Sequence, residues 1–254
     1  NFRRLMNYGM YGPKSPATNI LTETELQTMD PQELTDRIHN QNSYKHRIMY
    51  YGPTSEKELL AIINKNHQAP KKLKEIPVGN EFPRLETPVT KVLISPYEAK
   101  QIYMTQLSNR GEKFDPMIEP SRQMYNEYFG GGMNSIVFQE MRESRGLAYS
   151  AGAFLITPSK LKYPYVYRTF IATQNDKMID AMKAFDEIIN NMPESEKAFN
   201  LAKDALITRL RTERITKSDV LWSYLNAQDL GLTTDSRKEL FEKAQTMTLP
   251  EIKA

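Results

Sequence analysis

The segment 128–152, which reads YFGGGMNSIVFQEMRESRGLAYSAG, constrains the fold of this chain more than any other stretch of its sequence. Three consecutive glycines, Gly130–Gly132, predict the end of one helix and a tight turn after it. A second, short helix is expected to follow and to end at Gly146, and a strand is expected to begin at Ala148. The segment therefore predicts a helix that turns sharply into a strand.

Arg142 and Tyr149 stand on the two sides of that expected corner. They are seven residues apart, about two turns on a continuous helix, but Gly146 breaks the helix between them. We therefore expect the two side chains to meet at the corner. A guanidinium and a phenol are hydrogen-bond donors suited to a carbonyl oxygen or a developing oxyanion, and neither serves as a general base at neutral pH. Local chemistry alone favours simpler roles: Arg142 as a cation at a helix C-terminus, and Tyr149 as a strand aromatic with a satisfied hydroxyl.

Composition narrows the classes of function. At 254 residues, with 39% hydrophobic and 26% charged side chains, the chain can bury a sizeable core and is typical of a soluble globular protein. The formal net charge is only +3, and basic and acidic residues alternate, which argues against a nucleic-acid partner. No apolar run is long enough to span a membrane. The absence of cysteine excludes disulfides and cysteine-held zinc, and it leaves the compartment undetermined.

Neither a zinc-peptidase helix nor a phosphate-binding loop can be read from this sequence. The three histidines, His39, His46 and His67, lack the spacing of H-E-x-x-H and of H-x-x-E-H. The chain from residue 90 onward contains no histidine, so that part cannot use histidine as an acid or a base. Gly130–Gly132 follow an expected helix and lack the Gly-Lys-Ser/Thr of a P-loop. A nucleotide-binding domain is therefore not favoured.

Alternation and capping signals predict strands first and helices later. The expected helices lie at 31–39, from a Ser55 cap to Asn66, at 116–129, and in four stretches begun by Asn175, Pro193 with Ser195, Ser218 and Ser236. The expected strands lie at 45–51, 90–95, 101–108, 148–157 and 165–173, with a hairpin joining 90–95 to 101–108. The residues expected on the buried side of the helix after Ser55 are Leu59, Leu60, Ile62 and Ile63. This order predicts an α+β domain with a largely antiparallel sheet and helices packed on one face.

An internal repeat suggests the domain organisation. Gln27–Leu34 (QTMDPQEL) is echoed 218 residues later by Gln245–Ile252 (QTMTLPEI). Each copy carries a helix cap, a proline at or near the first turn and a glutamate three residues after the cap. An offset of that length is the size of a domain. We therefore expect 1–67 to be the tail of a preceding homologous domain, 68–89 a linker, and 90–254 most of a final domain, all within a longer protein.

The segment FGGGMNSIVFQEMRESRGLAYSAGAF closely resembles the second-half domain of the pitrilysin/insulin-degrading enzyme family of zinc metallopeptidases, which includes mitochondrial processing peptidase. The family pattern combines a glycine stop, a short helix that ends near an arginine, and a strand that begins near a tyrosine. The positions that meet it here are Phe138, Met141, Arg142, Gly146, Leu147 and Tyr149. The run YYGP at 50–53 is also similar to the strand and turn that end the family's domains.

This resemblance implies a processing-peptidase-like domain, namely the C-terminal half of a zinc-dependent endopeptidase that closes like a clamshell over peptides. It implies that Arg142 and Tyr149 hold the carbonyl oxygen of the peptide substrate as negative charge develops on it. Because the zinc motif is absent, it also implies that zinc is bound by an N-terminal catalytic half, on the same chain or on a partner subunit. The alternative is a non-catalytic scaffold or peptide-binding half of the same family.

Overall fold

The computed structural model describes residues 2–253, which divide into two compact units. The larger unit takes in the first 13 residues, Pro83–Arg214 and the chain from Ser223 onward. The smaller unit consists of Lys14–Phe82 and Ile215–Trp222. No helix in the described range combines the length and the apolar character needed to cross a membrane. Whether 1–67 derives from a preceding homologous domain stays a prediction.

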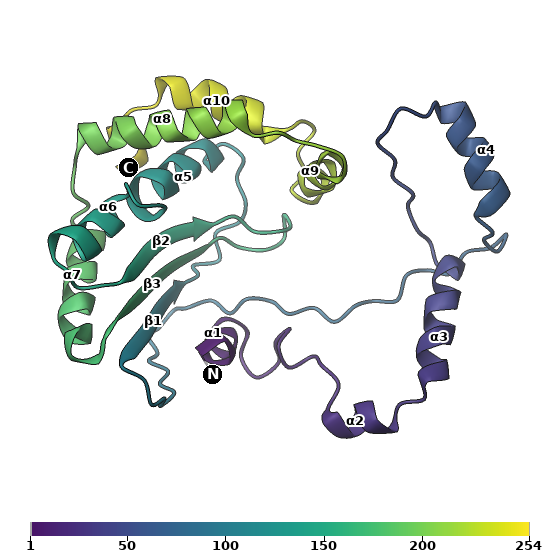
Figure 1. The fold of residues 1–254 in the computed structure, drawn as a ribbon, viewed down its shortest axis with the longest axis horizontal. Coiled ribbons are helices and arrows are strands. Elements are labelled where there is room, and N and C mark those ends of the chain that lie inside the picture. The colour runs from purple at the N-terminus through teal and green to yellow at the C-terminus, as the bar shows by residue number, and fades with distance from the viewer. Residues whose placement is uncertain (1, 254) are drawn as a thin grey trace. The chain divides into compact units, whose positions relative to one another are not determined.

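A three-stranded antiparallel sheet forms the centre of the larger unit (Figure 1). Its strands are β1 (Gln101–Ser108), β2 (Ser150–Ile156) and β3 (Val166–Gln174), in the spatial order β1-β3-β2. β3 is central and pairs antiparallel along both of its edges. Its valine, isoleucine, threonine and aromatic residues suit a strand that is covered on both faces. The expected α+β class with an antiparallel sheet is confirmed.

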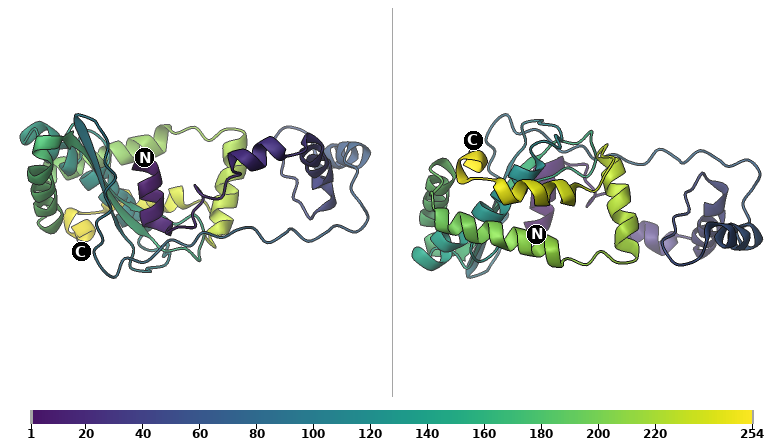
Figure 2. Two further views of the ribbon diagram at one scale, coloured as in Figure 1. Left: turned by 90° about the horizontal axis from the view of Figure 1, so that it is seen from below. Right: turned by 90° about the horizontal axis from the view of Figure 1, so that it is seen from above.

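Helices pack mainly against one face of this sheet (Figure 1). The helices and turns that lie wholly in the larger unit are α1 (Phe2–Tyr11), α5 (Glu119–Tyr125), η2 (Asn126–Gly130), α6 (Ile136–Phe138), η3 (Gln139–Ser144), η4 (Asn175–Lys177), α7 (Met178–Asn190), α8 (Glu196–Thr212), α10 (Ser236–Thr246) and α11 (Leu249–Lys253). The helix α9 (Ser218–Asp229) has residues in both units. Figures 1 and 2 both show α8 and α10 side by side. The segments η2 and η3 are π-helical continuations of α5 and α6, wider than an α-helix.

The core lies between the sheet and this helical layer. On α7 the buried side chains Ala181, Ala184, Phe185 and Ile188 fall at helical spacing, so one stripe of the helix faces inward. The other buried members of the core are Met124, Tyr128, Phe129, Ile136, Val137, Met141, Ala148, Ala153, Ile171, Phe199, Ala202, Leu206, Leu240, Ala244, Met247, Leu249 and Ile252. Burial of these apolar side chains is the main source of stability for the unit.

The opposite face of the sheet is partly covered by α1. Phe170 of β3 lies across from Thr105 on one neighbouring strand and from Gly152 on the other. The ring of Phe2 lies 6.2 Å from the ring of Phe170, and the ring of Tyr103 stacks on Phe170 at the same distance. An aromatic cluster therefore closes this face.

Short helices with strong caps make up the smaller unit. They are α2 (Glu23–Thr28), α3 (Pro31–His39), η1 (Asn40–Ser43) and α4 (Glu56–Asn66). Both α2 and α4 begin with a capping box, in which a hydroxyl and a glutamate satisfy the free amides of the first turn. The bounds expected for α3 and for the helix after Ser55 are confirmed.

Two of the expected strands are wrong. Residues 45–51 and 90–95 belong to no ladder, so the expected hairpin between 90–95 and 101–108 does not form. Instead, β1 pairs with β3, whose residues lie more than 50 positions further along the chain. An alternating pattern makes a strand extended, but a sheet forms only where a second strand supplies hydrogen bonds.

Other expectations need smaller corrections. Leu60 and Ile62 are 48% and 54% exposed, so α4 does not bury the face that its sequence predicts. Asn175 opens a 3₁₀ turn before α7 rather than capping it. The cap of α10 is Asp235, one residue before the expected Ser236, because its carboxylate accepts the Arg237 amide.

Candidate functional site

Hydrogen bonds within residues 135–148 form the corner at which the chain passes from α6 and η3 to β2. Ser135 caps α6: its Oγ accepts the Phe138 amide at 3.3 Å. The helix then widens into η3. Two residues after η3, Gly146 adopts a left-handed φ of +58°, which turns the chain away from the helix axis. Leu147 and Ala148 both donate their amides to the Met141 carbonyl, at 2.8 and 3.0 Å. Because Met141 is fully buried, the corner is anchored to the core.

Arg142 and Tyr149 meet at this corner. Arg142 lies in η3, and Tyr149 directly precedes β2, with its amide donating to the Ala172 carbonyl at 2.9 Å. The guanidinium carbon of Arg142 lies 5.4 Å from the centroid of the Tyr149 ring and 5.0 Å from that of Phe138. Such geometry is a cation–π contact. Single-turn π segments of the η3 kind occur frequently at functional sites.

Both side chains of the pair are open to solvent. The Arg142 side chain is 44% exposed and Tyr149 is 69% exposed. Glu143 is the nearest carboxylate to Arg142, with 3.5 Å between Nε and Oε1, and an exposed ion pair of that length holds the guanidinium only weakly. Within the described residues the Tyr149 hydroxyl has no hydrogen-bond partner. Both side chains therefore have N–H or O–H donors available to a molecule outside the chain.

The triple glycine supports the site without taking part in chemistry. A Cβ on Gly130 would stand 1.5 Å from the Ala153 carbonyl oxygen, so only glycine allows η2 to lie against β2. Gly132 has a φ of +86°, a conformation that side chains other than glycine rarely adopt. These residues act as the helix stop and turn that the sequence predicts.

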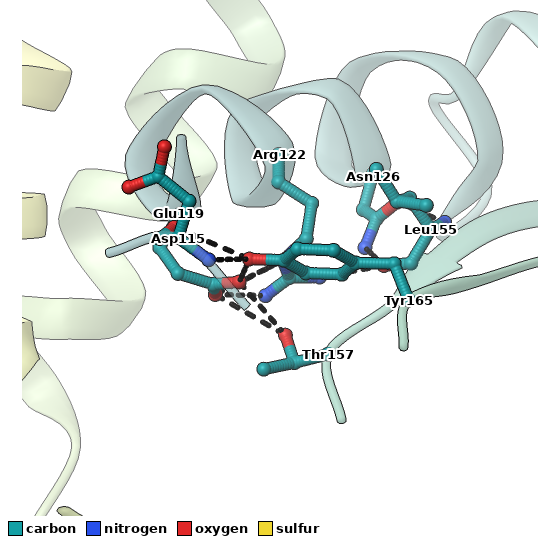
Figure 3. Close-up of polar contacts among 7 residues, drawn as sticks. All are labelled: Asp115, Glu119, Arg122, Asn126, Leu155, Thr157 and Tyr165. Atoms are coloured by element: carbon teal, nitrogen blue, oxygen red, sulfur yellow. Dashed lines mark hydrogen bonds and ion pairs between the residues drawn. The ribbon is translucent and has the colours of Figure 1, made fainter. Parts of the chain in front are cut away.

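A buried polar network fixes the far end of β2 against α5 and η2 (Figure 3). The side-chain amide of Asn126 accepts the Leu155 amide at 2.9 Å and donates to the Leu155 carbonyl at 3.0 Å. The same carbonyl accepts Arg122 Nη1 at 2.7 Å. Asn126 thus makes the two hydrogen bonds to the Leu155 backbone that a neighbouring strand would otherwise make.

Three side chains converge on the Glu119 carboxylate at the other end of this network (Figure 3). Arg122 donates through Nε to both oxygens of Glu119 at 3.0 Å. Thr157 Oγ1 donates to Oε2 at 3.1 Å, and the Tyr165 hydroxyl donates to Oε1 at 2.8 Å while accepting the Asp115 amide. Burial raises the pKa of the Tyr165 hydroxyl, and its bond to the Glu119 carboxylate raises that pKa further. The sequence analysis missed this network; the Glu-x-x-Arg spacing predicts the ion pair but not its burial.

Arg145 links η3 to α7. Its Nη1 donates to Glu187 at 2.8 Å, and its Nε lies 3.4 Å from Glu140. The bond from Arg145 lowers the pKa of Glu187, and the bond to Glu187 raises the pKa of Arg145. This ion pair ties the segment that carries Arg142 to its neighbouring helix.

The described residues do not supply a catalytic zinc site. No group of three or more histidine, cysteine, aspartate or glutamate side chains in residues 2–253 is placed to hold a metal ion. A catalytic zinc needs three protein ligands and an open position. The residues that could hold the zinc of a metallopeptidase are therefore not found in this part of the chain.

The fold defines the class of protein: an α+β domain in which helices pack on a three-stranded antiparallel sheet, with no grouped metal ligands among residues 2–253. The family model of the peptidase M16 inactive domain matches residues 47–206. The chain belongs to the M16 peptidase family, as an inactive domain of the C-terminal type. The expected membership in the pitrilysin family is thus confirmed. No curated protein matches the chain in a sequence comparison.

Several solved structures share the fold. A conserved protein from Enterococcus faecalis V583 has 16% identity and a TM-score of 0.68, over 99% of this chain and 59% of that one. The ferredoxin protease FusC, solved with Arabidopsis ferredoxin, has 12% identity and a TM-score of 0.64, over 97% and 27%. A chain of complex III2 from Candida albicans has 14% identity and a TM-score of 0.59, over 98% and 62%. This chain thus spans less than two thirds of each of these relatives.

Proposed function

We propose that this chain is part of the second half of a zinc-dependent M16 endopeptidase, and that Arg142 and Tyr149 hold the carbonyl oxygen of the scissile peptide bond. The observation that carries the proposal is the corner itself, where two exposed donor side chains converge at a guanidinium-to-ring distance of 5.4 Å. A carbonyl oxygen gains negative charge as the peptide bond is attacked, and fixed donors stabilise that charge.

The zinc and its ligands are proposed to lie in an N-terminal catalytic half, on the same chain or on a partner subunit. M16 peptidases depend on zinc, and this chain has no metal site of that kind in its described residues. The two halves would close like a clamshell around a peptide. The likeness of the fold to a protease, FusC, supports this organisation.

A non-catalytic scaffold half is the second candidate. It is supported by the likeness of the fold to a chain of complex III2, which is an assembly by its name. In a scaffold, neither Arg142 nor Tyr149 has a substrate to hold. What favours the first proposal is that both donor side chains occur together at one corner, where folding by itself requires neither of them.

The substitution Tyr149→Phe in the complete enzyme or complex tests the proposal. It keeps the ring under Arg142 and removes only the hydroxyl donor. Because loss of one oxyanion donor typically costs about 10²–10³ in kcat, we expect a fall of that size with KM and zinc content little changed. The matched control is Tyr97→Phe, since Tyr97 lies before β1 in the same unit and is also well exposed. A Tyr149→Phe enzyme with the kcat of the unmodified protein would rule out the catalytic role.

A further inference from the structure

Two histidines in the smaller unit point their ring nitrogens at each other. His46 Nε2 and His67 Nε2 are 2.7 Å apart, and their rings cross at 76°. The residues are separated by 21 positions: His46 lies in the extended segment after η1, and His67 ends α4. The contact therefore joins two segments that no ladder holds together.

The hydrogen bonds around the pair fix which nitrogen carries a lone pair. His46 Nδ1 lies 2.7 Å from the Tyr44 carbonyl oxygen, and because a carbonyl only accepts, Nδ1 carries the proton. In a neutral ring, Nε2 of His46 then presents its lone pair to His67. An imidazole whose second nitrogen donates to a backbone carbonyl is the usual arrangement of a metal-ligating histidine. The backbone of His67 is held at the end of α4, because its amide donates to the Ile63 carbonyl at 2.7 Å.

We propose that His46 and His67 form a two-imidazole site for a divalent transition metal ion of the zinc, nickel or copper class. In the neutral pair the proton between the two Nε2 atoms sits on His67, because His46 Nε2 accepts it; on binding the ion, that proton would move by exchange with water to His67 Nδ1, so that both Nε2 atoms present a lone pair to the metal. Two nitrogens bound to one tetrahedral zinc lie about 3.3 Å apart, so the present 2.7 Å has to widen by only about 0.6 Å. Because the rings belong to solvent-accessible side chains, a small rotation supplies that change.

The surroundings select the kind of metal. Lys45 pairs with Glu75, and the Lys74 ammonium lies 5.7 Å from the centre of the Tyr44 ring. Among the described residues no third histidine, cysteine, aspartate or glutamate joins the two rings in a metal-binding group, so hard cations such as Mg²⁺ and Ca²⁺ lack the oxygen ligands that they need. Imidazole nitrogens suit zinc, nickel and copper, with water completing the coordination.

Titration of the whole chain with Zn²⁺ and Ni²⁺ by isothermal calorimetry tests the site. We expect one ion per chain at neutral pH and a large loss at about pH 5, where imidazoles bind protons instead. His46→Gln and His67→Gln should each weaken binding by at least about tenfold, because even loss of an outer partner costs about 10–100-fold. His39→Gln is the matched control and should bind as the unmodified chain does. Binding that survives in the His46→Gln/His67→Gln double variant, or that His39→Gln abolishes, would overturn the proposal.

Limited trypsin digestion tests, independently of calorimetry, whether a metal ion bridges His46 and His67. Lys57 and Lys65 lie in the loop that the two histidines close. A metal bridge opposes opening of that loop, so at about 100 times the dissociation constant, cleavage at these lysines should slow by up to about 100-fold. Mg²⁺ should give no protection, and neither should Zn²⁺ with the His67→Gln variant. Cleavage that proceeds at the same rate with and without Zn²⁺ in the unmodified chain would show that the pair does not bridge through a metal.

Discussion

Glu119 and Arg122 lie one turn apart on α5 and form an ion pair, with 2.9 Å between Glu119 Oε2 and Arg122 Nη2. Each of the two side chains is only 11% exposed. A buried pair of this kind adds little stability by itself, but removal of one partner leaves an unpaired charge in the interior. Here the pair also holds Thr157 and Tyr165, which border the sheet.

The first prediction concerns this pair. Arg122→Met should lower the free energy of unfolding by about 3–5 kcal/mol, because Glu119 stays buried without its cation. Urea denaturation of the whole chain measures the effect. The control is Lys243→Met, which removes an exposed pair with Glu239 and should cost no more than about 1 kcal/mol. Equal losses from the two variants would mean that the Glu119 pair behaves as a surface pair.

The second prediction concerns the glycine stop. Gly130→Ala should destabilise the larger unit by about 1–3 kcal/mol or more, because the new Cβ would collide with the rigid Ala153 backbone. Gly79→Ala is the control, since nothing lies within 4 Å of a Cβ at that position. Thermal unfolding of both variants checks the prediction. A Gly130→Ala protein as stable as the Gly79→Ala protein would contradict the close approach of η2 to β2.

The sequence predicted those elements whose signals are local. The bounds of α3 and α4 follow from the Asp30 and Ser55 caps, which act within one turn of the chain. Alternation predicts β1, and aromatic and β-branched residues predict β3, while the corner between Arg142 and Tyr149 follows from Gly146. The contact of the two side chains could be predicted for the same reason.

Features that depend on distant partners were not predictable. The sequences of 45–51 and 90–95 both suggest strands, yet neither segment pairs with another strand, because pairing depends on which partner edges the rest of the fold leaves available. The π-helical widening in η3 has no sequence signal, because it depends on how the helix packs. The burial of Glu119 depends on Tyr165, which lies 46 residues away. No periodicity in a single sequence brings those two residues together.

The third prediction concerns alkaline pH. Burial raises the pKa of Tyr125, Tyr128, Tyr165 and Tyr167 above the ordinary tyrosine value of about 10. A raised pKa means that the folded state holds the proton more tightly. The contribution of these tyrosines to the free energy of unfolding is therefore fully present below about pH 10. It is lost as the pH rises from there toward their pKa values in the folded state.

Each such tyrosine contributes up to about 1.4 kcal/mol of lost stability per pH unit above that point. Urea denaturation between about pH 8 and about pH 11 measures the slope, and phenolate absorbance reports which tyrosines titrate before unfolding. Tyr167→Phe should reduce the slope, whereas Tyr97→Phe, at an exposed position, should leave it unchanged. A slope that does not depend on Tyr167 would contradict the assignment.

The fourth prediction tests the contact at the candidate site without any need for catalysis. Arg142 lies over the Tyr149 ring at an exposed corner, where a cation–π contact is worth about 0.5–1 kcal/mol. A double-mutant cycle of Arg142→Met and Tyr149→Leu should therefore give a coupling energy of that size in urea denaturation. The coupling should fall at high salt far less than that of an ion pair, because the attraction involves a ring face.

The control cycle pairs Arg142→Met with Tyr97→Leu. No contact between Arg142 and Tyr97 is seen among the described residues, so their changes should add within about 0.3–0.5 kcal/mol. Tyr149→Phe should keep most of the coupling, because the ring remains, even though the proposed catalytic donor is gone. A coupling of zero between Arg142 and Tyr149 would mean that the two side chains do not hold each other in place, and that a substrate would have to bring them together.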